Sequence, residues 1–327
     1  MRRMGGIQMA RTATADATSP AILVRLRNNG VYVALALLVL FNIFFTSNFA
    51  TVGTILGLLS QATFVLLVAL GLTLVIGTGG IDLSVGAIMA IASAVVPLYL
   101  GYTWPVAVLV ALIFCVLAGM LNGFLVAYIG MQPIVATLAL FVGGRGFAQV
   151  LVNGQLQTIG DPGFLALWRA TVFGVPMPVV IAAVVAVLVG LLVRRTTFGH
   201  YVLAVGGNRT ASYLSGHPVR SVLIAVYAIS GLLAGLAGTL ATARLAAGDP
   251  ATIGLLIELD AIAAVVIGGT PLSGGRMNVG GTVAGAILML VISATFVMNN
   301  INPIYAQILK AAIIVLAVYI QQGRRGS

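Results

Sequence analysis

The sequence has 327 residues, of which 61% are hydrophobic and 7% are charged, and its mean hydropathy is +1.16. A soluble domain carries roughly 25% charged residues, so this chain has too few polar side chains to cover a water-facing surface. The composition excludes a soluble globular fold and predicts a protein embedded in a lipid bilayer. The net charge of +10 does not indicate a nucleic-acid partner, because Lys and Arg collect in the cytoplasmic loops of membrane proteins.

Ten apolar runs predict the transmembrane helices, which need about 20 residues each. The runs cover residues 31–49, 55–77, 83–100, 106–128, 134–153, 177–193, 221–242, 257–272, 280–298 and 304–322. Gly, Pro and Asn separate them, and these residues favour turns. The predicted fold class is an all-α, polytopic bundle of about ten transmembrane helices with Gly-rich helix breaks. Residues 1–29 would form a basic N-terminal segment, residues 30–322 the membrane domain and residues 323–327 a short tail.

The arginines predict the orientation of the chain. Five precede the first span, four lie in residues 194–220, and Arg276, Arg324 and Arg325 fall on the same side. Only Arg169 and Arg244 fall in the loops of the other side, 154–176 and 243–256. Because positive residues mark cytoplasmic loops, both termini are expected to be cytoplasmic.

Motifs for catalysis are missing from the sequence. Nothing matches the phosphate-binding loop G-x-x-x-x-G-K-[ST], and Lys310 is the only lysine. His200 and His217 have no partner at metal-ligand spacing. The sequence therefore predicts no enzyme, no metal site and no cofactor, and any ATP used for transport must be hydrolysed by another chain.

The stretch GTGGIDLSVG, residues 77–86, places a carboxylate between two apolar runs. A charge at the centre of a membrane helix costs about 3 kcal/mol, so such groups are usually functional or buried in the bundle. Asp82 is predicted either to cap the following helix together with Ser84 or to contact a transported substrate. Gly79 and Gly80 would let the backbone turn sharply at this break, which would border the transport pathway.

A second stretch resembles the first. VIGTGGIDLSVG (75–86) and VIGGTPLSGG (266–275) share the letters VIG and a later L-S-x-G, which assigns Gly268, Gly269 and Ser273 to a second predicted helix break. Paired Gly-interrupted segments in two halves of a transporter point toward its pathway. Chance similarity in a chain with 40 glycines is the alternative.

Two further carboxylates, Glu258 and Asp260, begin the eighth run and should face different sides of a helix. Arg145 and Lys310 lie within predicted spans and are candidate charge partners for these acids. A structural salt bridge is the default interpretation, and contact with a substrate is the alternative. The sequence leaves the pairing open.

The loop 194–220 contains a predicted two-turn helix. Asn208 is a good N-cap and Gly216 a good residue after the C-cap, with RTASYLS between them. Ala211 and Leu214 would share one face of this helix, joined by Ser215. A helix so short is not stable alone in water, so it needs a docking surface on its own protein or on a partner.

Three spaced motifs resemble one known family. GGIDLSVG (79–86), TTFGHYVLAVGGNRTASYLSGHPV (196–219) and ELDAIAAVVIGGTPLSGG (258–275) are similar to motifs of the membrane permeases of bacterial ABC importers for ribose, xylose, galactose and galactofuranose. The resemblance covers about residues 30–322.

The resemblance implies a bacterial inner-membrane permease that pairs with a second, identical or paralogous permease. An ABC ATPase, often a tandem-domain one, would bind its cytoplasmic side, and a sugar-binding protein would dock outside. The coupling residues toward the ATPase would be Gly206, Gly207, Asn208, Ala211, Leu214, Ser215 and Gly216. His217 departs from the family pattern, in which an apolar residue is usual.

The expected function is import of a monosaccharide delivered by the binding protein and driven by the separate ATPase. Ser84, Asn122, Thr137 and Gln149 are candidate residues for a polar, uncharged substrate lining. Arg169 and Arg244 are candidate docking residues for an acidic rim of the binding protein. The alternatives are a related permease for a branched-chain amino acid or an autoinducer, or an ATP-independent secondary transporter or channel.

Overall fold

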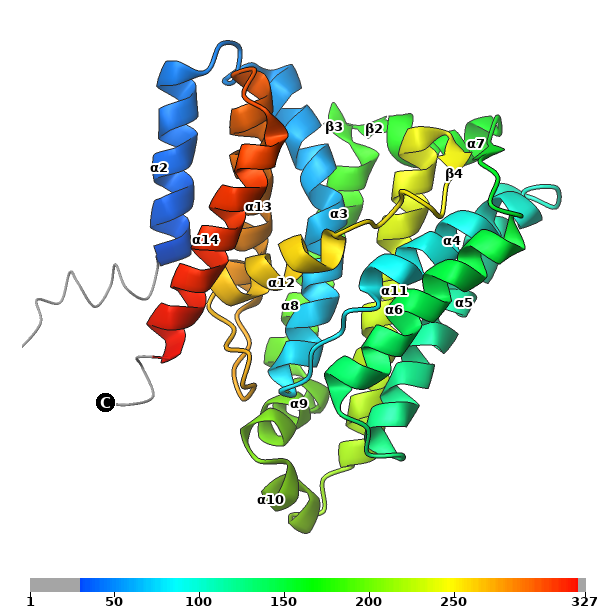
Figure 1. The fold of residues 1–327 in the computed structure, drawn as a ribbon, viewed down its shortest axis with the longest axis vertical. Helices are drawn as coiled ribbons and strands as arrows, with labels where there is room; N and C mark the ends of the chain where they lie inside the picture. Colours follow the sequence, from blue (N-terminus) through cyan, green and yellow to red (C-terminus); the bar gives the residue numbers. More distant parts are fainter. Residues whose placement is uncertain (1–29, 323–327) are drawn as a thin grey trace, which may run out of the picture.

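The computed structural model describes residues 30–322, which form a bundle of helices (Figure 1). The predicted segments 1–29 and 323–327 lie outside the described residues. The helices are α2 (Gly30–Phe45), α3 (Val52–Gly77), α4 (Val85–Tyr99), α5 (Trp104–Ala127), α6 (Pro133–Leu151), α7 (Pro162–Arg169), α8 (Met177–Arg195), α9 (Thr197–Gly207), α10 (Arg209–Leu214), α11 (Val219–Leu245), α12 (Ile257–Ile267), α13 (Val279–Met298) and α14 (Pro303–Gln322). Four two-residue strands form two antiparallel pairs, β1 (Gln157–Thr158) with β4 (Ala247–Gly248) and β2 (Thr171–Val172) with β3 (Val175–Pro176).

All ten predicted apolar runs contain a helix, but they are not ten full spans. Among the described residues, α3, α5, α6, α8, α11 and α13 are long and apolar enough to cross a membrane. The apolar helices α2 and α4 and the part of α14 up to Val315 are shorter. The prediction of a span over 257–272 is wrong in extent, because α12 has only 11 residues. At roughly 1.5 Å per residue it measures about 16 Å, about half of a hydrocarbon core of roughly 30 Å.

Two long helices, α3 and α11, form the centre of the bundle. In Figure 1, α2, α13 and α14 lie on one side of them and α4, α5 and α6 on the other. Glycines bring α11 and α5 into close contact, since a side chain on Gly231 would collide with the carbonyl of Cys115, and one on Gly119 with that of Tyr227. Small residues allow such close approach between membrane helices.

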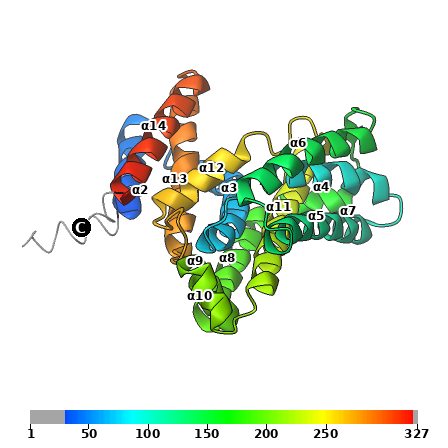
Figure 2. The same cartoon turned by 60° about the horizontal axis from the view of Figure 1, so that its bottom comes forward.

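The segment 194–220 contains two helices and not one. The expected short helix is present as α10, and it is preceded by α9, which the sequence analysis assigned to a loop. Both helices project from one end of the bundle in Figures 1 and 2, while α7 and the short strands lie at the other end. Thr196 begins α9 by accepting a hydrogen bond from the backbone N–H of Gly199, a local capping contact.

Candidate functional site

The first helix break, residues 78–84, is organised around Asp82, whose side chain is fully buried. One carboxylate oxygen accepts hydrogen bonds from the backbone N–H and the hydroxyl of Ser84, at 3.0 and 2.6 Å. The other oxygen accepts one from the hydroxyl of Ser230 on α11, at 2.9 Å. Asp82 thus accepts a backbone N–H at the start of α4, as the capping interpretation expected. Ser84, the N-cap of α4, makes no side-chain capping bond, and the second oxygen of Asp82 ties the break to α11.

Two of the predicted lining residues support this break from neighbouring helices. Asn122 on α5 donates a hydrogen bond to the hydroxyl of Ser84 at 2.8 Å, and its own side chain is fully buried. Thr137 on α6 is also fully buried and accepts a hydrogen bond from the backbone N–H of Leu83 at 3.2 Å. Of the other two candidates, Ser84 is itself fully buried in the break, and Gln149 is half-buried near the other end of α6. In this structure Asn122 and Thr137 therefore order the break rather than face an open space.

The second helix break, residues 268–278, has an analogous polar support. The Asn278 side chain accepts a hydrogen bond from the backbone N–H of Gly281 at 3.0 Å and donates one to the carbonyl of Gly268 at 2.8 Å. It thereby caps α13 and satisfies the end of α12 at once. Gly269 has a φ of +94°, which favours glycine.

The two breaks meet each other at the end of α9. The backbone N–H of Gly275 donates a hydrogen bond to the carbonyl of Gly77 at 3.0 Å. Gly79, with a φ of +81°, lies against the carbonyl of Ser273. Gly206, near the C-terminus of α9, packs so closely that a Cβ there would collide with the carbonyl of Gly77. We call the contact of Gly77, Gly206 and Gly275 the glycine junction.

Gly80 and Gly207 differ in their surroundings. A Cβ on Gly80 would lie 2.8 Å from the phenolic oxygen of Tyr227, whereas one on Gly207 would meet nothing within 4 Å. A side chain at position 80 would therefore displace the buried ring of Tyr227 on α11. At position 207 the structure gives no steric reason for glycine.

The predicted coupling helix begins and ends as its sequence indicates. The Asn208 side chain accepts a hydrogen bond from the backbone N–H of Ala211 at 2.9 Å, and Gly216 has a φ of +79°. The backbone N–H of Ser215 donates to the carbonyl of Ala211 and closes the last turn. Ala211 and Ser215 are exposed, and the side chain of Leu214 is 79% exposed. The helix thus presents an apolar surface that no described residue covers.

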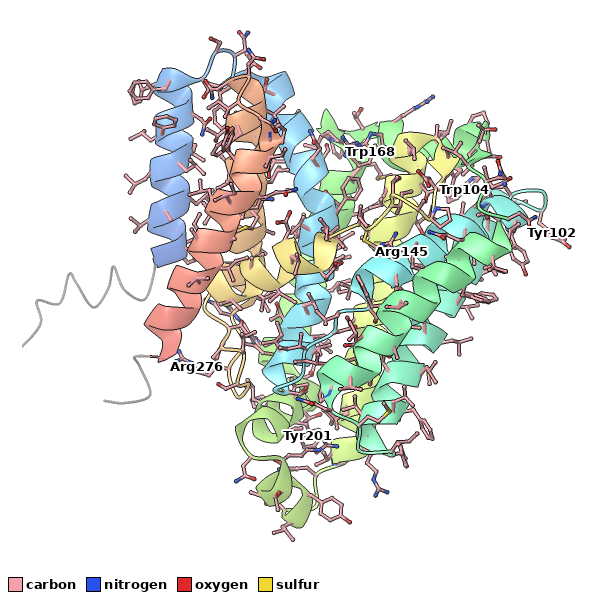
Figure 3. The ribbon with its side chains drawn as sticks, in the orientation of Figure 1. Tyr102, Trp104, Arg145, Trp168, Tyr201 and Arg276 are labelled. Atoms are coloured by element: carbon pink, nitrogen blue, oxygen red, sulfur yellow. The ribbon has the colours of Figure 1, made fainter. Side chains whose placement is uncertain are left out.

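His217, the position that departs from the family pattern, packs inside its own segment. Its ring lies 5.0 Å from the ring of Tyr201 on α9, and its side chain is half-buried. Figure 3 shows Tyr201 at the end of the bundle where α9 and α10 lie. His217 therefore contributes to the contact between α9 and the start of α11.

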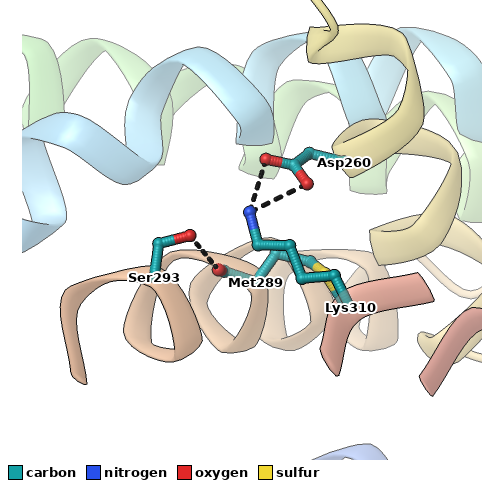
Figure 4. A network of polar contacts seen from close by, with 4 residues as sticks. All are labelled: Asp260, Met289, Ser293 and Lys310. Carbon is teal, nitrogen blue, oxygen red and sulfur yellow. Dashed lines mark hydrogen bonds and ion pairs between the residues drawn. The ribbon is translucent and has the colours of Figure 1, made fainter. Parts of the chain in front are cut away.

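The two predicted charge partners, Lys310 and Arg145, make different kinds of contact. Lys310 on α14 forms an ion pair with Asp260 on α12, with distances of 2.9 and 2.8 Å to the two carboxylate oxygens (Figure 4). This confirms the default interpretation of a salt bridge for these two residues. Glu258, two positions earlier, is buried on the other side of α12, as its spacing from Asp260 predicted.

Arg145 does not form an ion pair with a carboxylate of the described residues; it binds backbone carbonyls. Its guanidinium donates to the carbonyls of Pro250 (2.8 Å), Ala251 (3.2 Å) and Ile253 (3.2 Å), and to that of Gly86 on α4 (3.3 Å). Figure 3 labels Arg145 in the middle of the molecule, where α6 approaches this loop. The fork of a guanidinium suits several acceptors at once, so Arg145 fixes the loop that leads into α12.

One of the two outer arginines, Arg244, packs against an aromatic pair. The guanidinium of Arg244 lies 5.6 Å from the ring centre of Trp168 and 5.7 Å from that of Phe64, and these two rings stack at 5.3 Å. Arg169, the neighbour of Trp168 in the last turn of α7, is exposed. Both arginines therefore lie at the end of the bundle opposite α10.

Comparison with known proteins identifies the family. Residues 54–318 match the family described as "Branched-chain amino acid transport system / permease component". The chain belongs to this permease family. The permease is 42% identical over 275 residues to the galactofuranose transporter permease protein YtfT of Escherichia coli (strain K12), covering 84% of this chain and 80% of that protein. No solved structure matches it.

Two further relatives are also permeases. The fructose import permease protein FruF of Bifidobacterium longum (strain NCC 2705) is 38% identical over 256 residues, with 76% of this chain and 72% of that protein covered. The ribose import permease protein RbsC of Escherichia coli (strain K12) is 38% identical over 301 residues, with 89% of this chain and 93% of that protein covered.

Sequence reasoning missed several residues on which the site of this permease depends. Ser230 binds Asp82 from 148 positions away, and Gly77 and Gly275 form the glycine junction. The run of small residues around Ser230 was a signal of close helix packing, but it gave no indication of the partner. Among the described residues, no group of three or more His, Cys, Asp or Glu is arranged to hold a metal ion.

Proposed function

We propose that this permease imports a monosaccharide as one subunit of an ATP-driven transporter. The names of its relatives support a sugar, since they are permeases for galactofuranose, fructose, ribose and L-arabinose. The family description names branched-chain amino acids, which makes these the second candidate substrate class.

The observation that carries the proposal is the surface of α10. Tyr213 and Leu214 are 66% and 79% exposed on a helix of six residues that projects from the bundle. Such a helix has little stability of its own, and exposed apolar groups of this kind mark interaction sites. We assign this surface to the contact with a separate ABC ATPase, together with the predicted coupling residues Gly206, Gly207, Asn208, Ala211, Leu214, Ser215 and Gly216.

The glycine junction supplies a route from α10 to the transport pathway. Movement of α10 and α9 would displace Gly206, which packs against both helix breaks through Gly77 and Gly275. Because packed glycines leave no compressible side chain between them, a shift at one backbone is passed to the next. ATP binding at the end with α10 and a loaded binding protein at the opposite end would thus bias the same equilibrium between two arrangements of the helices.

The orientation of the chain follows the same proposal. Four exposed arginines lie at or near the end that carries α10: Arg194 and Arg195 in the last turn of α8, Arg209 at the start of α10, and Arg276, which Figure 3 labels. Arg169 ends α7 and Arg244 lies in the last turn of α11, and both are exposed at the other end. The end with α10 would be cytoplasmic, as would the segments 1–29 and 323–327. Arg169 and Arg244 would face a sugar-binding protein, and a second permease copy or paralogue would complete the membrane part.

Purification of the tagged permease from its native host tests the coupling surface. We expect an ABC ATPase to co-purify at near-equal copy number. Tyr213→Asp should abolish this co-purification, because binding would bury an unpaired charge in an apolar contact. Tyr102→Asp is the matched control: Tyr102 is 76% exposed in the turn before α5, away from α10, and its substitution should leave the ATPase bound. A stable permease oligomer that never recovers an ATPase would contradict the proposal.

Uptake by the assembled importer distinguishes the two substrate classes. Reconstituted with its ATPase and binding protein, the permease is expected to accumulate a monosaccharide when ATP is present. Accumulation of leucine, isoleucine or valine instead would assign the branched-chain amino acids named in the family description.

A further inference from the structure

A cleft of about 790 Å³ lies between the two halves of the bundle. Its polar lining comes from four parts of the chain: Arg244 at the end of α11, Thr252 in the loop before α12, Asp260 on α12, and Gln307 and Lys310 on α14. Phe64 of α3 supplies an aromatic wall. Sites for small molecules have volumes of about 300–1,000 Å³ and combine an apolar lining with a few polar groups.

The cleft reaches the middle depth of the bundle. Phe64 lies halfway along α3, a helix long enough to cross the membrane, and Asp260 lies in the first turn of the half-length helix α12. The N-terminus of α12 therefore begins at the cleft wall, where Leu255, Leu256 and Ile257 also line it. Discontinuous helices that begin at the midplane form the substrate sites of many transporters.

The polar groups of the cleft have unused hydrogen-bonding capacity. Lys310 uses two of its three N–H donors on Asp260, and the carboxylate keeps acceptor positions free. The amide of Gln307, which lines the cleft, has no hydrogen-bond partner among the described residues. Because Asp260 and Lys310 neutralise each other, these groups suit a neutral ligand with many hydroxyls better than an ion.

The apolar part of the cleft fits the other side of such a ligand. Phe64 stacks with Trp168 at an interplanar angle of 13°, and this pair is fixed by the guanidinium of Arg244. A sugar ring has a C–H face that packs on an aromatic surface and hydroxyls at its rim that need donors and acceptors. A lipid tail would leave the Gln307 amide without a partner and the free donor and acceptor positions of the ion pair facing hydrocarbon, which is costly.

We propose that this cleft is the binding site for the monosaccharide within the membrane domain, with Gln307 and the Asp260–Lys310 pair bonded to its hydroxyls. The proposal rests on the proposed sugar import and adds the residues that recognise the sugar after its release from the binding protein. It differs from the expectation that Asn122 and Thr137 line the pathway, since those side chains are fully buried here.

Steric filling of the cleft tests its location. In the complete importer reconstituted in liposomes, with radiolabelled ribose, fructose, arabinose or galactose, we expect Gln307→Trp to slow uptake about tenfold or more, the size of an overpacking penalty. Ile308→Trp is the matched control, because Ile308 is 62% exposed and does not line the cleft, so uptake should stay within about twofold of wild type, as for surface substitutions. ATP hydrolysis stimulated by the binding protein should persist in both variants and shows that they are folded and assembled.

Removal of one polar group tests the chemistry. Gln307→Leu keeps the volume but removes the amide, and we expect uptake to fall about threefold to tenfold, the effect of one hydrogen bond. Uptake at the wild-type rate in both Gln307 variants would overturn the assignment of the cleft while leaving sugar import intact. If Gln307→Trp changed the permease oligomer, the cleft would be a contact between copies and not a sugar site. If the wild-type importer accumulated none of the sugars, the proposed function would be wrong and this assignment with it.

Discussion

The backbone N–H of Gly275 lies 3.0 Å from the carbonyl oxygen of Gly77 and donates a hydrogen bond to it. This bond joins the second helix break to the end of α3, and Gly206 packs directly against both residues. Two helix breaks and the helix before α10 therefore share one point of backbone contact. A displacement of any one of these three segments must therefore be accommodated by the other two.

The glycine junction predicts different effects for two adjacent glycines. Gly206→Ala places a Cβ against the carbonyl of Gly77 and should destabilise the permease by about 1–3 kcal/mol, the cost of overpacking. Gly207→Ala meets nothing within 4 Å and should be neutral or slightly stabilising, because alanine favours the helix. The thermal unfolding midpoint in detergent measures both effects, and equal midpoints would show that the junction is not tightly packed.

Replacement of the Asp82 carboxylate by an amide should loosen the first helix break. In Asp82→Asn a single acceptor oxygen replaces two, so the hydroxyls of Ser84 and Ser230 cannot both be satisfied as they are now. We expect a loss of about 1–3 kcal/mol in the free energy of unfolding, the cost of leaving a buried donor unsatisfied.

Unfolding by SDS in mixed micelles measures this loss, with Asp161→Asn as the matched control. Asp161 caps α7 by accepting a hydrogen bond from Phe164, and asparagine caps a helix equally well. A second variant, Ser230→Ala, should show coupling to Asp82→Asn in a double-mutant cycle. Additive effects would mean that the contact between Asp82 and Ser230 contributes nothing to stability.

The cap of α10 should control the order of the coupling helix. Asn208→Ala removes the bond to the Ala211 N–H and should cost about 1 kcal/mol, a large loss for a helix of six residues. Asn208→Asp keeps a capping oxygen and should preserve the helix. Hydrogen exchange of the α10 amides reports the difference, and co-purification of the ATPase should follow it. Equal exchange in the two variants would exclude capping as the source of order.

The exposed arginine of α7 should govern association with a binding protein. Arg169→Glu is expected to slow association about two- to fivefold and to weaken its salt dependence. The effect should be this small because a single exposed charge pair contributes little free energy and acts mainly on the association rate. Arg276→Glu is the control, since Arg276 is exposed at the end of the bundle with α9 and α10 (Figure 3). Association rates measured over a range of salt concentrations test both, and an unchanged salt slope for Arg169→Glu would remove this residue from the docking surface.

The sequence alone determined the features that depend on neighbours along the chain. In a bilayer the backbone must satisfy its hydrogen bonds within each segment, so the ten apolar runs had to become helices. The cap of α10 joins Asn208 to Ala211, only three positions away, and could be read directly. The separation of Glu258 and Asp260 to different sides of α12 follows from helical geometry for the same reason.

The tertiary structure decided which of these elements meet. Asp82 binds Ser230, Lys310 binds Asp260 while Arg145 binds carbonyls, and Gly77 meets Gly206 and Gly275. Membrane helices are apolar on nearly every side, so their sequence pattern does not mark the face that packs inward. Only the packed bundle fixes which faces turn toward each other, and with them the partners of each buried polar group.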